Sequence, residues 1–213
     1  MKELLRKHKA SWANKEYFVS AMTGLLCLFA SLVFNYFTNS YAATKQSNFV
    51  SDIILDNIPV LNVQFLVTYG AIFFIFFVVA LIAEEPRRLP FIVKSVALFV
   101  VIRAVFITLT HIAPSPDVIA LGDSELLKMI GMNYTSDLFF SGHAGIPFLL
   151  ALTFWDSKKL RISFIIISII LAASVLLGHL HYSIDVFAAY FITHTIFTIS
   201  YRLFRKDFDL MIG

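Results

Sequence analysis

The chain has 213 residues, of which 59% are hydrophobic and only 15% are charged, and its mean hydropathy is +0.81. Soluble domains are usually nearer half apolar and about a quarter charged, so this composition excludes an ordinary soluble globular domain. A single cysteine, Cys27, excludes an internal disulfide framework and a cysteine-based metal site. The net charge of +3 would suit nucleic acid, but the basic residues are placed as in a membrane protein.

The basic N-terminal segment, residues 1–16, leads directly into a long apolar run. A cleaved signal peptide has a short apolar region followed by small residues at the cleavage site. Here the apolar run continues without such a site. We therefore expect residues 1–16 to be a cytoplasmic segment and the run to be a retained first membrane span.

Apolar segments recur along the rest of the chain, and a helix needs about 20 mostly apolar residues to cross the hydrocarbon core of a bilayer. The six segments are 17–39, 59–83, 89–111, 138–155, 162–180 and 184–204. Internal repeats and low-complexity segments are absent from the sequence. The expected fold is an all-α bundle of six transmembrane helices that forms one domain, 1–213, with a short cytoplasmic tail at 205–213.

Basic residues are concentrated on alternate loops, and Lys and Arg favour the cytoplasmic side of a membrane. Fourteen of the 17 basic residues fall in the N-terminus, the 84–94 turn, the 156–161 turn and the C-terminus. Only Lys45 and Lys128 fall on the other side, and Arg103 lies inside the third span. This distribution predicts that both termini are cytoplasmic.

Arg103 lies inside an apolar segment, about two turns from its outer end. A buried arginine in a membrane normally faces a polar interior and has a partner. One interpretation is a structural ion pair with an outer-loop carboxylate, or a side chain that extends to the interface. The other is a guanidinium that binds phosphate, because its planar set of donors matches phosphate oxygens.

The stretch "SDLFFSGHAG", residues 136–145, begins the fourth span on the outer side. Ser141 and Gly142 favour a tight turn, and the Ser141 side chain could cap the helix. Backbone amides at a helix N-terminus favour an anion. Taken alone, His143 is more often a structural hydrogen-bond donor than a catalyst at such a position.

The second polar cluster is "GHLHYSID", residues 178–185. His181 and Asp185 are four residues apart, and on a helix such residues share a face, so the carboxylate can orient the imidazole. The alternatives are a pair that only satisfies itself and a metal site that includes His179. His179 and His181 would point to different sides of a helix, which disfavours metal.

The predicted topology places Arg103, His143, His181 and Asp185 near the outer ends of their spans. Two histidines, a carboxylate and an arginine at one depth suit phosphoryl transfer. One histidine would attack phosphorus, the other would protonate the leaving oxygen, and arginine would balance the phosphate charge.

These motifs resemble the sphingomyelin synthase family, the lipid phosphotransferase branch of the type 2 phosphatidic acid phosphatase superfamily. The family motif Cys-Gly-Asp-x3-Ser-Gly-His-Thr is similar to "TSDLFFSGHA", 135–144, and His-Tyr-Ser/Thr-x-Asp-Val is matched by "HYSIDV", 181–186. "RR" at 87–88 and "RAVFITLT" at 103–110 are similar to a further motif with altered spacing. The Cys-Gly-Asp-x3-Ser-Gly-His-Thr motif is matched at Asp137, Ser141, Gly142 and His143 and not at Thr135, Ser136 and Ala144.

The resemblance implies a catalytic triad of His143, His181 and Asp185, with Arg103, Ser141 and Gly142 near the phosphate. Asp137, His179 and Tyr182 would be supporting residues. The implied reaction moves a phospho-head group from a glycerophospholipid to a lipid alcohol such as ceramide or diacylglycerol through a phosphohistidine. It implies no cofactor and no metal, and a site on the extracytoplasmic face of a plasma, inner or Golgi-type membrane.

Two other functions remain open at this point. A phosphatase or phospholipase C-like hydrolase would use water as the acceptor. The signature of that branch has an arginine six residues before the second catalytic histidine, where this chain has Val175. A transporter or scaffold that uses these polar groups only for structure is the third possibility.

Overall fold

A computed structural model describes residues 2–119 and 138–212, and these residues form helices and loops without strands. Short 3-10 turns lie at Leu55–Asn57 and Pro86–Arg88, and a π-helical turn at Phe65–Tyr69 precedes the second long helix. The helices are α1 (Lys2–Ala13), α2 (Lys15–Ala43), α3 (Gly70–Glu84), α4 (Leu89–Leu109), α6 (Gly142–Thr153), α7 (Lys158–Leu177), α8 (Ser183–Leu203) and α9 (Arg205–Ile212).

Five helical segments are long and apolar enough to cross a membrane: Lys15–Ala43, Phe65–Glu84, Pro86–Leu109, Lys158–Leu177 and Ser183–Leu203. The segment expected at 138–155 differs, because its helix α6 has only 12 residues. At 1.5 Å per residue this helix is roughly 18 Å long, well short of the roughly 30 Å hydrocarbon core. The all-helical membrane architecture agrees with the prediction, and the sixth span stays a prediction.

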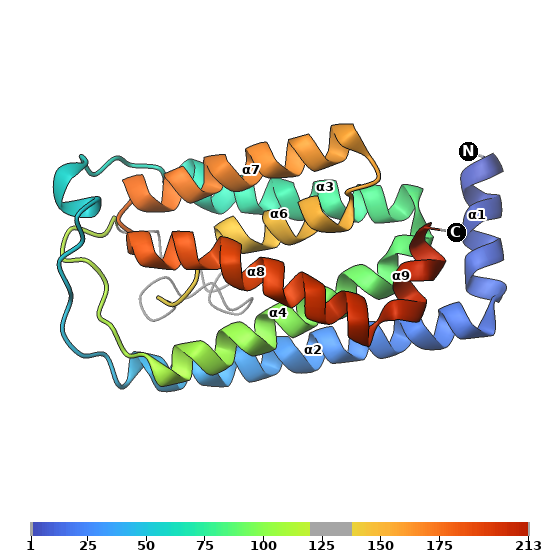
Figure 1. Ribbon diagram of the computed structural model, residues 1–213, viewed down its shortest axis with the longest axis horizontal. Coiled ribbons are helices and arrows are strands. Elements are labelled where there is room, and N and C mark those ends of the chain that lie inside the picture. The colour runs from blue at the N-terminus through green and yellow to red at the C-terminus, as the bar shows by residue number, and fades with distance from the viewer. Residues whose placement is uncertain (1, 120–137, 213) are drawn as a thin grey trace.

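The helices form one elongated bundle with both termini at the same end (Figure 1). We call this the terminal end; the 84–88 and 154–157 turns lie there too. The 44–64 loop, the 110–119 segment and the 178–182 turn lie at the opposite end. Helix α2 packs along α4, while α6 packs between α7 and α8.

Charged turns are joined to one another at the terminal end. Lys7 of α1 pairs with Glu85 at 2.6 Å, and Tyr17 donates its hydroxyl hydrogen to the Pro86 carbonyl. Arg88 pairs with Asp156 of the α6–α7 turn at 2.5 Å, and this hydrogen-bonded ion pair holds the pKa of the Asp156 carboxyl below its usual value. These contacts join α1 to the 84–88 turn, and that turn to the α6–α7 turn.

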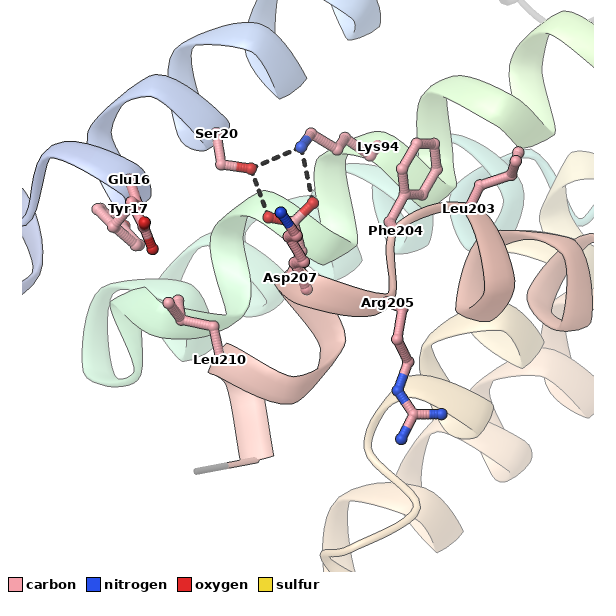
Figure 2. A pocket seen from close by; sticks show the side chains of 10 residues that line it. Glu16, Tyr17, Ser20, Lys94, Leu203, Phe204, Arg205, Asp207 and Leu210 are labelled. Carbon is pink, nitrogen blue, oxygen red and sulfur yellow. Dashed lines mark hydrogen bonds and ion pairs between the residues drawn. The ribbon is translucent and has the colours of Figure 1, made fainter.

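Helix α9 folds back against α2 and α4 through a small polar cluster. Lys94 donates to Asp207 Oδ2 at 2.7 Å and to Ser20 Oγ at 2.5 Å, and Ser20 donates to Asp207. Figure 2 shows these three side chains pointing toward one another, while Arg205 points away from them. The three residues also line a cavity of about 580 Å³. Both side chains of the Lys94–Asp207 ion pair are largely buried, and this pair anchors α9.

Close packing brings α4, α6 and α8 together near the middle of the bundle. A Cβ atom on Gly145 would lie 2.7 Å from the Phe99 ring and 2.9 Å from Thr193 Oγ1. No real side chain tolerates such distances, so α6 can lie this close to its neighbours only because residue 145 is glycine. The start of α6 is thereby held against the helices that carry the other polar residues.

Candidate active site

Four polar residues singled out from the sequence lie close to one another near the end opposite the termini: Arg103, His143, His181 and Asp185. Arg103 comes from α4, residues 141–143 begin α6, and His181 and Asp185 flank the first residues of α8. The backbone N–H of Ser141 donates to the Asp185 carbonyl at 3.0 Å, which joins the start of α6 directly to α8. Residues separated by up to 82 positions in the sequence therefore surround one buried location.

His181 and Asp185 are in contact, but not for the reason that the sequence indicated. His181 Nδ1 lies 3.3 Å from Asp185 Oδ2, and both side chains are buried. Helix α8 begins only at Ser183, with Tyr182 as its N-cap, so His181 precedes the helix and the two residues do not share a helical face. The Asp185 side chain instead points back past the N-terminus of α8, where it also accepts a hydrogen bond from the backbone N–H of Tyr182 at 3.0 Å.

The turn that carries His179 ends α7 in a Schellman motif. Leu180 N–H donates to the Val175 carbonyl and His179 N–H to the Leu176 carbonyl, and His179 has a φ of 51°. Glycine is the usual residue at this left-handed position. Both ring nitrogens of His179 are buried without a hydrogen-bond partner among the described residues. His179 lines a cavity of about 290 Å³ together with Tyr182. His181 and Asp185 are not among the residues that line this cavity.

Arg103 is buried, with 7% of its surface exposed, and it organises the segment before α6. Its Nε donates to the Phe140 carbonyl at 2.9 Å, and a Cβ on Gly142 would lie 3.8 Å from the same nitrogen. Phe140 has a φ of 28°, which non-glycine residues rarely adopt. Its ring is held between Phe99 and Phe106. The arginine bond and this packing together stabilise the unusual backbone at Phe140.

Ser141 occupies the N-cap position of α6, but its side chain makes no capping hydrogen bond. The Ser141 hydroxyl is fully buried and has no hydrogen-bond partner among the described residues. Asp185 Oδ1 is in the same situation. Unsatisfied buried polar atoms are costly, so two of them at one location are typical of a binding or catalytic site.

His143 lies on the first turn of α6 and makes a hydrogen bond with the backbone of Val67. It is close enough to His181 and Arg103 for positive charges on these groups to repel one another. Val67 belongs to the π-helical turn at Phe65–Tyr69. Such turns free backbone groups from the regular helical pattern and are frequent at functional sites.

Sequence reasoning missed two contributors from the second span and the loop before it. One is the Val67 backbone, which no side-chain pattern could reveal. The other is Asp52, whose carboxylate accepts the backbone N–H of Ser183 at 2.6 Å. Asp52 stands in a polar loop with no recognisable motif, and only its position in the fold brings it to α8.

Asp137 lies outside the described residues, as does Lys128. Within residues 2–119 and 138–212, no group of three or more His, Cys, Asp or Glu side chains is arranged to hold a metal ion.

No curated protein and no solved structure matches the chain. Residues 135–203 match the family model described as PAP2 superfamily C-terminal, and the matched region contains His143, His181 and Asp185. The match covers about a third of the chain and shows that this part is similar to the PAP2 superfamily, whose members are typically phosphatases or phosphotransferases.

Proposed function

We propose that this protein is a membrane lipid phosphotransferase that moves a phospho-head group from a glycerophospholipid to a lipid alcohol such as ceramide or diacylglycerol. One observation carries the proposal: two histidines, an aspartate and an arginine from three separate helical regions converge at one buried location. The superfamily match supports lipid phosphatase or phosphotransferase chemistry in general.

His181 is the proposed nucleophile. Its Nδ1 faces Asp185, so Nε2 is the nitrogen left to attack phosphorus. The carboxylate would hold the Nδ1–H tautomer and stabilise the positive charge that develops on the ring. Attack forms an N–P bond and breaks the P–O bond to diacylglycerol, which leaves as an alcohol.

His143 is the proposed acid and base. In the first step it would donate a proton to the departing glycerol oxygen. In the second step it would take the proton from the acceptor hydroxyl, whose oxygen attacks phosphorus while the N–P bond to His181 breaks. The hydrogen bond between His143 and the Val67 backbone would hold the ring in place for both transfers.

Arg103 and Ser141 are proposed to bind the phosphate. The guanidinium lies against Gly142 at the start of α6, where backbone amides also favour an anion. The unsatisfied Ser141 hydroxyl supports this assignment, because a phosphate oxygen would supply its missing acceptor. Asp137, His179 and Tyr182 would have supporting roles.

The active site is proposed to face the extracytoplasmic side of a plasma, inner or Golgi-type membrane, with six spans and both termini cytoplasmic. The common location of the termini at one end of the bundle supports an even number of spans (Figure 1). The basic turns at that end agree with a cytoplasmic location.

Reconstitution with labelled phospholipid tests the proposal. The purified protein is placed in vesicles of phosphatidylcholine or phosphatidylethanolamine with ceramide or diacylglycerol as the acceptor. Transfer of the labelled head group to the acceptor is expected. Release of soluble phospho-head group without transfer would instead assign a hydrolase, and failure of both reactions would reject lipid phosphoryl chemistry and favour a transporter or scaffold.

A further inference from the structure

The 44–64 loop reaches across the end of the bundle to the first residue of α8. Asp52 Oδ2 accepts the backbone N–H of Ser183 at 2.6 Å, and Asp52 is 8% exposed. The first backbone N–H groups of a helix have no partner within the helix. Asp52 supplies the missing acceptor for the Ser183 N–H from a segment more than 130 residues away in the sequence.

Asp52 is itself fixed within its loop. Its other oxygen, Oδ1, accepts the backbone N–H groups of Ile54 at 2.9 Å and Leu55 at 3.1 Å. Its own backbone N–H donates to Asp56 Oδ2 at 3.1 Å. The two carboxylate oxygens therefore have separate tasks: one shapes the loop and the other holds α8.

Tyr182, the residue before Ser183, is also held by hydrogen bonds to distant loops. The Tyr182 hydroxyl donates to the Ala113 carbonyl at 2.9 Å and accepts the backbone N–H of Val50 at 3.3 Å. Tyr182 and Ser183 are the residues that directly follow His181. The segment between His181 and Asp185 is consequently held from outside by two loops.

The carboxylate is suited to remain ionised in this position. Burial alone would raise the pKa of Asp52, but the hydrogen bonds from Ser183, Leu55 and Ile54 outweigh burial and hold the pKa below its usual value. A negative charge at the N-terminus of α8 is also favoured by the helix dipole.

We propose that Asp52 is a positioning residue, which fixes the start of α8 so that Asp185 holds the His181 imidazole in line for attack on phosphorus. This inference rests on the proposed function. The Asp52 carboxylate accepts hydrogen bonds from its own loop and from the backbone of Ser183, so it acts on His181 through the turn that joins His181 to Asp185. Misplacement of a reacting group by about 1 Å can cost on the order of 100-fold in rate.

Two single variants remove the bond from opposite sides. Asp52→Asn keeps one oxygen for the turn amides of Ile54 and Leu55 and places an NH₂ group against the Ser183 amide. Ser183→Pro removes both groups of Ser183 that hydrogen-bond to Asp52, the amide hydrogen and the side-chain hydroxyl, and proline is well tolerated at the first position of a helix. Tyr182, with a φ of −72° and a ψ of 158°, already has the extended backbone that a following proline requires.

Head-group transfer is measured for both variants, the double variant and a control, Asp117→Asn. Asp52 and Asp117 both line the cavity of about 290 Å³ beside Tyr182, so the control removes a neighbouring carboxylate and leaves the Ser183 bond intact. We expect kcat to fall at least about tenfold in each single variant with little change in KM. The double variant should be no worse than the poorer single variant, because both remove one interaction. Additive losses, or an equal loss in Asp117→Asn, would overturn the proposal.

Amide hydrogen exchange of the peptide that covers residues 181–186 gives a readout independent of activity. Exchange should be several-fold faster in Asp52→Asn than in wild type and unchanged in Asp117→Asn. Unchanged exchange in Asp52→Asn would overturn the positioning role. A wild-type protein without lipid activity would reject the proposed function, whereas the exchange measurement would still test the attachment itself.

Discussion

Asp185 Oδ2 holds two groups at once: the His181 imidazole at 3.3 Å and the backbone N–H of Tyr182 at 3.0 Å. The carboxylate thus caps its own helix while it contacts the histidine. Because His181 lies outside α8, its ring is oriented by the turn as well as by the carboxylate. The geometry of the proposed nucleophile therefore depends on how the chain enters the helix.

The division of roles between the two histidines can be tested through the covalent intermediate. His181→Ala should form no acid-labile phosphoenzyme with labelled phospholipid, because the attacking nitrogen is gone. His143→Ala should still form it, more slowly by roughly 100-fold or more, because only proton transfer is lost. The measurement is acid-labile phosphate on the purified protein after a rapid quench.

His194→Ala is the matched control, since His194 is exposed on α8 and lies thirteen residues beyond His181 in the sequence. It should match wild type. Acid-labile phosphate on the His181→Ala protein would contradict the assignment of His181 as the nucleophile.

Arg103→Lys should reduce activity far more than the unchanged charge suggests. Lysine cannot provide the planar pair of donors that fits phosphate, and it lacks the Nε–H that holds the Phe140 carbonyl at 2.9 Å. We expect kcat/KM for transfer to fall by roughly 100-fold, which corresponds to about 2.7 kcal/mol of transition-state stabilisation. Arg202→Lys, an exposed position at the terminal end, should have no effect. Wild-type turnover in Arg103→Lys would refute the phosphate-binding role.

Local sequence patterns were enough to predict the long apolar helices and the polar residues that lie inside them or at their ends. Helix α6 departs from the expectation, because hydropathy does not detect where a helix begins, and the unusual φ at Phe140 delays that start to Gly142. The same limitation explains His181: spacing of four residues indicates a shared helical face only where both residues are helical. Asp52 and Val67 were unpredictable, since their contacts join segments that are distant in sequence and carry no motif.

The Lys94–Asp207 ion pair should contribute strongly to stability, although it is remote from the proposed active site (Figure 2). Both side chains are mostly buried, at 14% and 11% exposed. Asp207→Asn would leave the Lys94 ammonium without its counter-charge, and we expect a loss of about 3 kcal/mol in the free energy of unfolding. Thermal unfolding in detergent micelles measures it.

Asp209→Asn on the same helix provides the comparison. Asp209 pairs with Arg205, but both side chains are more than half exposed, so the loss should be about 1 kcal/mol or less. Replacing both Lys94 and Asp207 with apolar residues should restore part of the stability that Asp207→Asn loses. Equal unfolding temperatures for Asp207→Asn and Asp209→Asn would show that the buried pair contributes little.

Gly145→Ala should disturb both stability and activity, because the added methyl group would meet the Phe99 ring at 2.7 Å. Phe99 packs against Phe140, whose carbonyl binds Arg103, so a shift of the ring reaches the start of α6. We expect a loss of about 1–3 kcal/mol in the free energy of unfolding, as for other overpacked cores. Gly70→Ala is the control, since its methyl group would meet Leu171 at 3.6 Å, an ordinary contact. Removing the ring with Phe99→Leu in the Gly145→Ala background should recover part of the loss, and the absence of any recovery would exclude contact with Phe99 as its cause.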